Sequence, residues 1–136
     1  MYNDNYTELL IKDKTVETDV ERKALFLIFS TDDLYRKVTH LYDFKEHSIK
    51  PESLENGEVD LSSSSRKLVM AAFNLYNGHY KADICDTFAG LDDENFDLMI
   101  QAIKIRFNKD EWNKNLLNTM LLAYALLCRP YLESYY

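Results

Sequence analysis

Apolar residues recur at helical spacing in two segments, and both predict core helices. Residues 66–77 follow a run of serines at 62–65, one of which would cap the helix, and Gly78 stands where a C-terminal capping glycine belongs. The apolar face of this segment consists of Leu68, Val69, Ala72, Phe73 and Tyr76. Asp92 would cap a helix over residues 93–107. Its apolar stripe consists of Phe96, Met99, Ile100, Ile103 and Phe107.

The C-terminal segment predicts a further helix. Asn108 and Glu111 resemble a capping box that opens a helix over residues 109–128, and Pro130 ends it. Residues 116–127 are apolar on most sides. This part of the helix therefore either lies at the centre of the bundle or forms a dimer interface.

The N-terminal half predicts two helices. Residues 20–29 follow a cap at 18–19 and favour a helix, although their second half would also suit a short strand. A cap at 31–32 opens a helix that we expect to run over residues 33–42. Its apolar stripe consists of Leu34, Val38, Leu41 and Tyr42.

The remaining segments complete an all-α architecture. Residues 43–62 lack helical periodicity and predict a loop, with a short helical turn at 52–54 after Pro51. Residues 1–18 predict either a loosely attached arm or a short helix. We expect a compact bundle of about five helices in a single domain, with residues 1–18 as an N-terminal arm and residues 19–136 as the helical domain. The expected core consists of Leu25, Phe29, Leu68, Ala72, Phe73, Phe96, Ile100, Ile103, Leu116, Met120 and Leu127.

Composition narrows the class of protein. The chain has 136 residues, the length of one domain, and its 46% apolar and 29% charged residues are ordinary for a globular protein. Three Gly and two Pro are too few for an all-β fold, which uses such residues at its turns. The net charge of −7 argues against a protein that binds nucleic acid directly, because such proteins neutralise phosphates with clustered Lys and Arg.

The sequence also predicts a compartment. No basic segment followed by an apolar run opens the chain, so we expect no signal peptide. The most apolar stretch, residues 116–128, is shorter than the roughly 17–25 residues of a membrane span. Cys85 and Cys128 lie among apolar neighbours, which favours buried, reduced thiols over a disulfide. These features favour a cytoplasmic protein that does not bind membranes.

Few residues suggest chemistry. His40, His47 and His79 lack the ligand spacings of a metal site, and no nucleophile or phosphate-binding motif is present, so we expect no cofactor and no metal. The acidic pairs at residues 32–33 and 92–94 open predicted helices, where the helix dipole favours carboxylates.

Two asparagines are harder to assign. Asn74 and Asn77 lie in an otherwise apolar helix, and asparagine is a poor residue in a helix interior. Asn77 would serve as a C-terminal helix residue, and Asn74 would make a buried structural hydrogen bond. Alternatively, both would form an enzyme site with His79 and Arg106, in which the histidine acts as an acid–base group.

One segment resembles a known family. Residues 65–78, SRKLVMAAFNLYNG, resemble the signature of DUF6075, a domain of unknown function in small proteins of Firmicutes and their phages, in which a T-x-x-S-x-K segment leads into AFNL[WY]NG. The other similar segments are residues 24–26, 49–54 and 101–107. The resemblance covers roughly residues 19–107. Residues 58–61 replace a W-Q-T-like segment of the family, and residues 108–136 extend beyond its usual end. The resemblance implies a bacterial or mobile-element setting and no particular activity.

The leading functional hypothesis is a phage or mobile-element accessory protein that acts by binding another protein. Its carboxylates would occupy the basic groove of a nuclease or regulator, and could inhibit a nucleic-acid-binding host protein. The expected partner-binding residues are Glu52, Glu55, Glu58, Asp60, Asp92, Asp93 and Glu94. A pocket at Asn74 and His79 would favour the enzyme instead. A structural module that forms a homodimer through residues 116–127 is the third alternative.

Overall fold

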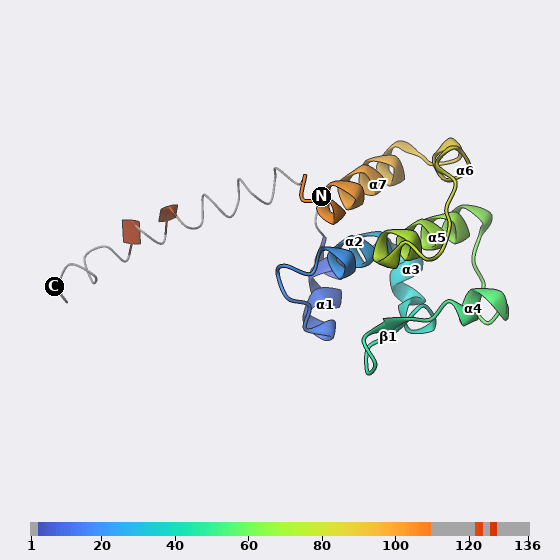
Figure 1. The fold of residues 1–136 in the computed structure, drawn as a ribbon, viewed down its shortest axis with the longest axis horizontal. Helices are drawn as coiled ribbons and strands as arrows, with labels where there is room; N and C mark the ends of the chain where they lie inside the picture. The colour runs from blue at the N-terminus through green and yellow to red at the C-terminus, as the bar shows by residue number, and fades with distance from the viewer. Residues whose placement is uncertain (1–2, 110–121, 124–125, 128–136) are drawn as a thin grey trace.

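The computed structural model describes residues 3–109, 122–123 and 126–127, and these form a bundle of helices (Figure 1). The elements in chain order are α1 (Asp4–Asp13), α2 (Val20–Phe29), α3 (Asp32–Arg36), the 3-10 helix η1 (Val38–His40), β1 (Tyr42–Asp43), β2 (Ser48–Ile49), α4 (Glu52–Glu55), α5 (Ser63–Asn77), α6 (Ile84–Ala89) and α7 (Asp93–Arg106). The expected all-α fold class is confirmed, and β1 and β2 add one small antiparallel hairpin. Within the described ranges no helix has the length and apolar composition to cross a membrane.

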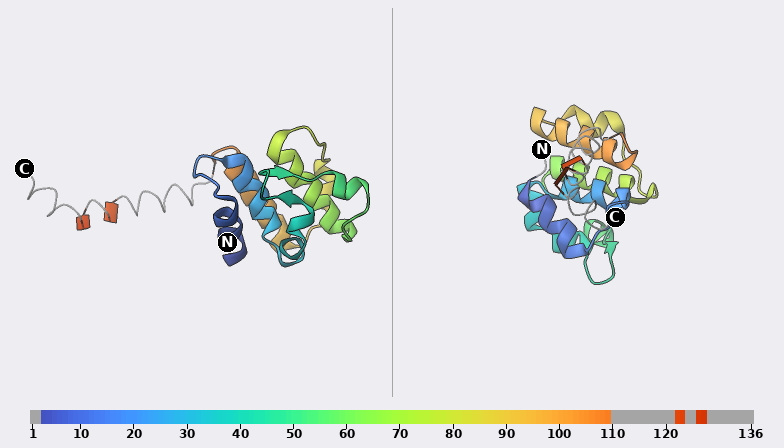
Figure 2. Two further views of the ribbon diagram at one scale, coloured as in Figure 1. Left: turned by 90° about the horizontal axis from the view of Figure 1, so that it is seen from below. Right: turned by 90° about the vertical axis from the view of Figure 1, so that its left-hand side faces the viewer.

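Helix α2 is the centre of the bundle. Every residue in its second half, residues 24–29, is completely buried. The helix packs chiefly against α5 and α7, and Figures 1 and 2 show α1 and α7 on opposite sides of it. A helix that is apolar all round needs cover on every side, and these neighbours provide it. Residues 24–29 therefore complete a helix rather than the short strand that their composition also allowed.

Short polar side chains fix the starts of the main helices. Asp19, Ser62 and Asp92 each accept a hydrogen bond from the backbone N–H three residues further on, at 3.0, 3.1 and 2.7 Å. Gly78 ends α5 with a φ of +71°, in the left-handed region that glycine adopts readily. These caps confirm the helices expected after residues 19 and 92, while α5 begins earlier than expected.

The segment after α2 differs from the single helix expected over residues 33–42. Helix α3 ends at Arg36, η1 forms one 3-10 turn, and Tyr42 already belongs to β1. The expected apolar stripe is nevertheless buried, since Leu34, Val38, Leu41 and Tyr42 are at most 6% exposed. β-branched residues such as Val38 and Thr39 weaken a helix, which explains why the helix does not continue to residue 42. The four apolar side chains are buried although the backbone is not one continuous helix. The short helical turn expected after Pro51 is confirmed as α4.

Two helices lie where the sequence left a choice or predicted none. Residues 4–13 form α1, the helical alternative for the N-terminal segment, and its Tyr6 and Leu9 are part of the same hydrophobic core as α2. Helix α6 is too short to show a period in the sequence. Cys85 in its first turn is free and exposed, which corrects the expectation of a buried thiol; Cys128 lies outside the described residues.

The orientation of α7 is the main correction to the expected core. Met99, Ala102 and Ile105 face α2 and are at most 2% exposed. Phe96 is 43% exposed, which makes its placement in the core wrong. The other deviating core residues are Ile100 and Ile103, which are half-buried, Leu127, which is 74% exposed, and Leu116 and Met120, which lie outside the described residues. The other members, Leu25, Phe29, Leu68, Ala72 and Phe73, are confirmed as buried.

The burial pattern predicts unequal costs for one substitution at two sites. Ile28 is completely buried in α2, whereas Ile11 on α1 is 70% exposed. We expect Ile28→Ala to lower the free energy of unfolding by about 2–5 kcal/mol, because it removes buried methyl groups and leaves a cavity. The matched control Ile11→Ala should cost less than about 1 kcal/mol. Urea unfolding followed by circular dichroism measures both, and equal costs would contradict the central position of α2.

Candidate functional site

The first group of expected partner-binding residues lies on a short, well-anchored segment. Pro51 opens α4, and the apolar side chains of Leu54 and Val59 are buried and hold residues 52–60 on the core. Gly57 turns the chain with a φ of +66°, and the amide of Glu58 donates to the carbonyl of Ser53 at 3.0 Å. The acidic side chains that this arrangement leaves on the surface are Glu52, Glu55, Glu58 and Asp60.

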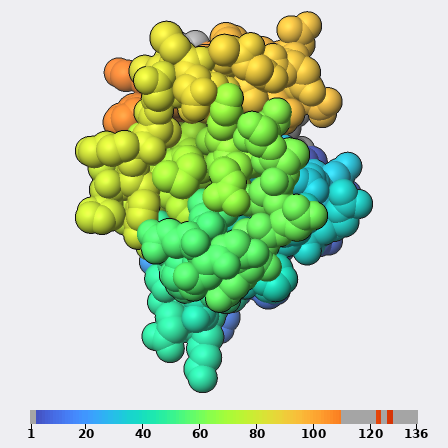
Figure 3. Space-filling model, turned by 90° about the vertical axis from the view of Figure 1, so that its right-hand side faces the viewer, coloured from blue at the N-terminus to red at the C-terminus, as the bar shows by residue number. Residues whose placement is uncertain are grey.

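The second group opens α7. Asp92 caps the helix, and Asp93 and Glu94 occupy its first turn, so the helix dipole explains why carboxylates stand here. All three residues are exposed. Figure 3 shows residues 52–60 (green) in the lower half of one face of the molecule and the residues from about 90 onward (gold) along the upper edge of the same face. The two groups therefore share a face without touching one another.

In the part of the chain that the structure describes, these seven carboxylates are not used in ion pairs, a property that they share with other exposed acids such as Asp4 and Glu46. Asp13, Asp19 and Asp33, by contrast, pair with Arg22 or Lys37. Between the two groups Lys67 is bound to Asp86 at 3.1 Å. Among the described residues, the face thus carries two separate patches of acidic side chains without ion pairs, and Lys37 and Arg66 contact the first patch only through the backbone carbonyls of Asp60 and Leu54.

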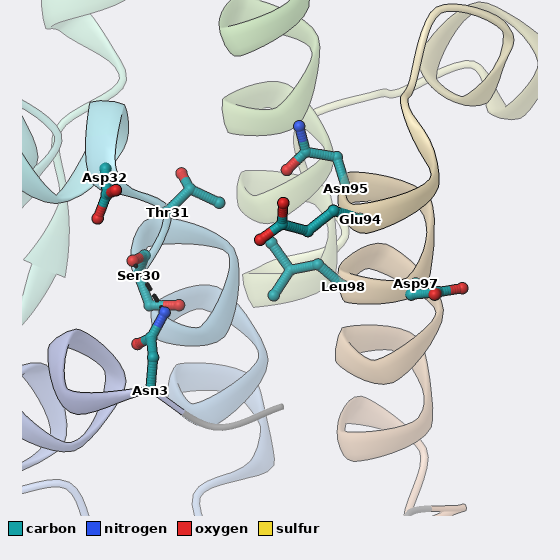
Figure 4. Close-up of a pocket in the computed structure, with 8 residues that line it drawn as sticks. All are labelled: Asn3, Ser30, Thr31, Asp32, Glu94, Asn95, Asp97 and Leu98. Carbon is teal, nitrogen blue, oxygen red and sulfur yellow. Dashed lines mark hydrogen bonds between the residues drawn. The ribbon is translucent and has the colours of Figure 1, made fainter.

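A cleft extends the second patch (Figure 4). It has a volume of about 460 Å³ and lies between the turn joining α2 to α3 and the first half of α7. Glu94 and Leu98 reach from α7 toward Thr31, and Asp32 lines the opposite end. The side chain of Asn3 is tied to this turn through the carbonyl of Ser30, at 3.4 Å. Carboxylates, amides and hydroxyls line the cleft, so a positively charged group is the chemistry that it suits.

The alternative enzyme site does not assemble around a shared cavity. The amide of Asn74 donates to the carbonyl of Tyr80 at 2.6 Å, which is the structural hydrogen bond that the sequence suggested. The carbonyl oxygen of the Asn77 side chain accepts from the backbone of His79 at 3.0 Å. His79 is exposed, and its ring contacts Tyr80 edge to face. The two asparagines therefore shape the chain after α5.

Arg106 has a structural contact as well. Its Nε atom donates to the carbonyl of Leu75 at 2.7 Å and so links the end of α7 to the end of α5. Terminal helix carbonyls lack partners within the helix, and arginine commonly supplies one. Arg106 thus helps to hold the two helices together and is not placed in a shared site with His79.

The most connected polar centre is one that the sequence does not reveal. Asp13, at the end of α1, is buried, and its Oδ1 accepts from the phenol of Tyr42 at 2.9 Å and lies 2.7 Å from Nδ1 of His47. Its Oδ2 accepts from the hydroxyl of Thr15 at 2.9 Å and lies 3.6 Å from Nε of Arg22. We call Asp13, Arg22, Tyr42 and His47 the Asp13 centre.

Arg22 makes hydrogen bonds within this centre and to Asp19 outside it. Its guanidinium donates to the phenol of Tyr42 at 3.0 Å, to Asp19 at 2.8 Å and to the backbone carbonyl of His47 at 2.7 Å. His47 has a φ of +56°, a left-handed conformation in which histidine is several-fold enriched among non-glycine residues. This conformation lets both the ring and the carbonyl of His47 face the centre.

Burial sets the proton affinities here. It raises the pKa of the Tyr42 phenol well above its ordinary value, and the hydrogen bond from Arg22 lowers it only in part. Burial also lowers the pKa of Arg22, but the hydrogen bonds with Tyr42 and Asp19 more than compensate and raise it overall. Because the polar atoms of the Asp13 centre bind one another, we interpret it as the anchor of the hairpin. Within the described residues no group of three or more His, Cys, Asp or Glu side chains is arranged to hold a metal.

A faint signal for the Asp13 centre does exist in the sequence. Asp13 ends a helix, where the dipole disfavours a carboxylate, so an unusual partner was to be expected there. No pattern identifies that partner, because Tyr42 and His47 follow 29 and 34 positions later.

Comparison with known proteins gives a family without an assigned activity. The sequence model described as "Family of unknown function (DUF6075)" matches residues 1–118. This match is wider than the roughly 19–107 expected, since it includes α1 and part of the C-terminal segment. No curated protein and no solved structure matches the chain.

Removing the buried carboxylate of Asp13 should lower the stability of the folded protein. Asp13→Ala leaves the buried phenol of Tyr42 without its acceptor, whereas Arg22 keeps Asp19, and we expect a loss of about 1–3 kcal/mol in the free energy of unfolding. The exposed Asp97 provides the matched control, and Asp97→Ala should cost less than about 0.5 kcal/mol. Hydrogen exchange at the amide of Lys50, which is bonded to the carbonyl of Leu41 at 2.8 Å, should accelerate in the Asp13 variant. An unchanged exchange rate would show that the hairpin does not depend on Asp13.

The pKa of Tyr42 predicts a pH dependence of stability. Since its pKa is higher in the folded protein than the ordinary value of 10.0, the unfolded chain loses this proton first as the pH rises. The contribution of Tyr42 is therefore complete below pH 10 and falls above it. We expect Tyr42→Phe to lose less stability than the wild type between about pH 10 and 11.5. Urea midpoints across this range test it, and identical slopes would contradict it.

Proposed function

The chain belongs to the DUF6075 family of unknown function, and we propose that it acts by binding another protein through its unpaired carboxylates. The observation that carries the proposal is that all seven carboxylates at residues 52–60 and 92–94 are exposed and lack ion pairs within the described ranges. The buried Asp13 and the half-buried Asp19 and Asp33, by contrast, have cationic partners. Charge that the fold does not use is available to a partner.

The chemistry of these residues favours a partner with a basic surface. Exposed ion pairs are individually worth about 0–1 kcal/mol, so no single carboxylate should dominate the affinity. Their common field acts over about 8 Å at physiological ionic strength and would mainly raise the rate of association. The acidic cleft beside Glu94 would accept a lysine or arginine side chain of the partner.

Basic grooves that bind nucleic acid are surfaces of this kind. A nuclease or regulator of the host is therefore the class of partner that we propose, and occupation of its groove would inhibit it. The phage or mobile-element setting in which such an inhibitor would work rests on the family resemblance alone. The exposed apolar residue Ile84 of α6, 75% exposed, would add contact area to the complex.

Association kinetics test the proposal. The full chain is used to isolate a partner from a bacterial lysate, and the association rate with the purified partner is then measured at several salt concentrations. We expect Glu52→Gln/Glu55→Gln or Asp93→Asn/Glu94→Gln to lower this rate about two- to fivefold at low salt, with a smaller effect at high salt.

A charge-matched control separates a local effect from net charge. Asp4 on α1 and Glu46 in the hairpin turn are exposed, and neither forms an ion pair within the described ranges. Asp4→Asn/Glu46→Gln removes the same charge and should leave the association rate within about 1.5-fold of the wild type. An association rate that is unchanged in both acidic double variants, or that falls by the same factor in the control variant, would contradict the proposal.

A further inference from the structure

One face of α7 is apolar and only partly covered in the described structure, where Phe88 of α6 packs edge to face on Phe96 with ring centroids 5.4 Å apart. Phe96 is 43% and Phe107 is 57% exposed, and Ile100 and Ile103 between them are half-buried. These four residues follow the spacing i, i+4, i+7 and i+11, so they form a continuous stripe along the helix. The stripe is distinct from the face that packs on α2. We call these four residues the α7 stripe.

The described C-terminal residues expose a second apolar surface. Residues 122–123 and 126–127 are helical, and Leu122, Leu126 and Leu127 are 64%, 64% and 74% exposed. Leu122 and Leu126 are four positions apart, which is the spacing of neighbours on one face of a helix. The described residues of one chain thus expose apolar side chains in two helical segments, and apolar helix faces pack against one another.

We propose that a second copy of this chain covers both surfaces, with Leu122 and Leu126 of each copy packed on the α7 stripe of the other. In a two-fold dimer the same contact occurs twice, so both exposed surfaces of both chains are buried by one arrangement. The proposal is independent of the proposed function, because the carboxylates of residues 52–60 take no part in it.

The area fits a stable dimer. A buried aromatic side chain contributes about 150–250 Å², and each of the exposed phenylalanines and leucines still presents roughly half of its surface or more. Together, the α7 stripe, Leu122 and Leu126 would bury on the order of 500 Å² per copy, more than half of the roughly 800 Å² per partner in a standard interface.

Sedimentation equilibrium of the full chain tests the dimer. At about 1–100 μM we expect a species of twice the 16.0 kDa chain mass. Phe96→Ser/Phe107→Ser and Leu122→Ser/Leu126→Ser should each weaken dimerisation at least tenfold. The matched control Ile11→Ser/Val16→Ser changes two residues that are 70% and 63% exposed on the N-terminal side and should leave the dimer intact.

Cross-linking reports the geometry even if a serine variant folds poorly. Two chains that carry Cys85→Ser and Cys128→Ser are mixed, one with Phe107→Cys and the other with Leu126→Cys. We expect a disulfide-linked mixed dimer on mild oxidation. A monomer at all concentrations, a dimer weakened by only one of the two serine pairs, or preferential linkage between identical chains would each overturn the proposal.

Discussion

A carboxylate withdrawn from water must find hydrogen-bond donors, and Asp13 finds them in segments that are far apart in the sequence. Tyr42 and His47 approach it from the hairpin, and Arg22 approaches from the first turn of α2. Each donor also contacts another member of the group, so the hairpin, α1 and α2 are fixed by one set of bonds. Loss of the carboxylate would leave a buried phenol without its acceptor beside the half-buried Arg22. The small hairpin depends on this polar anchor, since two-residue strands have little stability of their own.

The hydrophobic core and the Asp13 centre meet in α2, which begins with a polar turn and continues as a helix without an exposed face. Arg22 lies in the turn, and residues 24–29 fill the space between α5 and α7. Charges inside this framework are matched, as Lys23 is with Glu17 at 3.0 Å. Carboxylates outside it are unmatched at residues 52–60 and 92–94. Because the charges around α2 are paired, they do not destabilise the fold. The unpaired carboxylates on the surface still give the protein a negative electrostatic field that acts on other molecules.

The sequence predicted the parts of the fold whose signals are local. Caps at Asp19, Ser62 and Asp92 and the glycine at residue 78 act within one turn of their helices, so α2, α5 and α7 were identified. Elements that depend on distant contacts were not, and the hairpin, whose anchor lies in α1, is the clearest case. The acidic residues were expected on the surface because isolated charges avoid burial. The Asp13 centre was missed because no spacing joins its members.

Helix α7 shows why a correct period does not determine the buried face. Its apolar stripe is regular, yet Ala102 and Ile105, outside the stripe, face α2. Small residues such as Ala102 allow close approach of two helices, whereas Phe96 and Phe107 would hold them apart. A helix with two apolar faces belongs between two layers, and the described part of one chain supplies one of them in full and only part of the other, through Phe88 of α6. If a second copy supplies the other, the acidic patches are duplicated, and a partner with two basic sites would bind the dimer with an avidity that a monomer lacks.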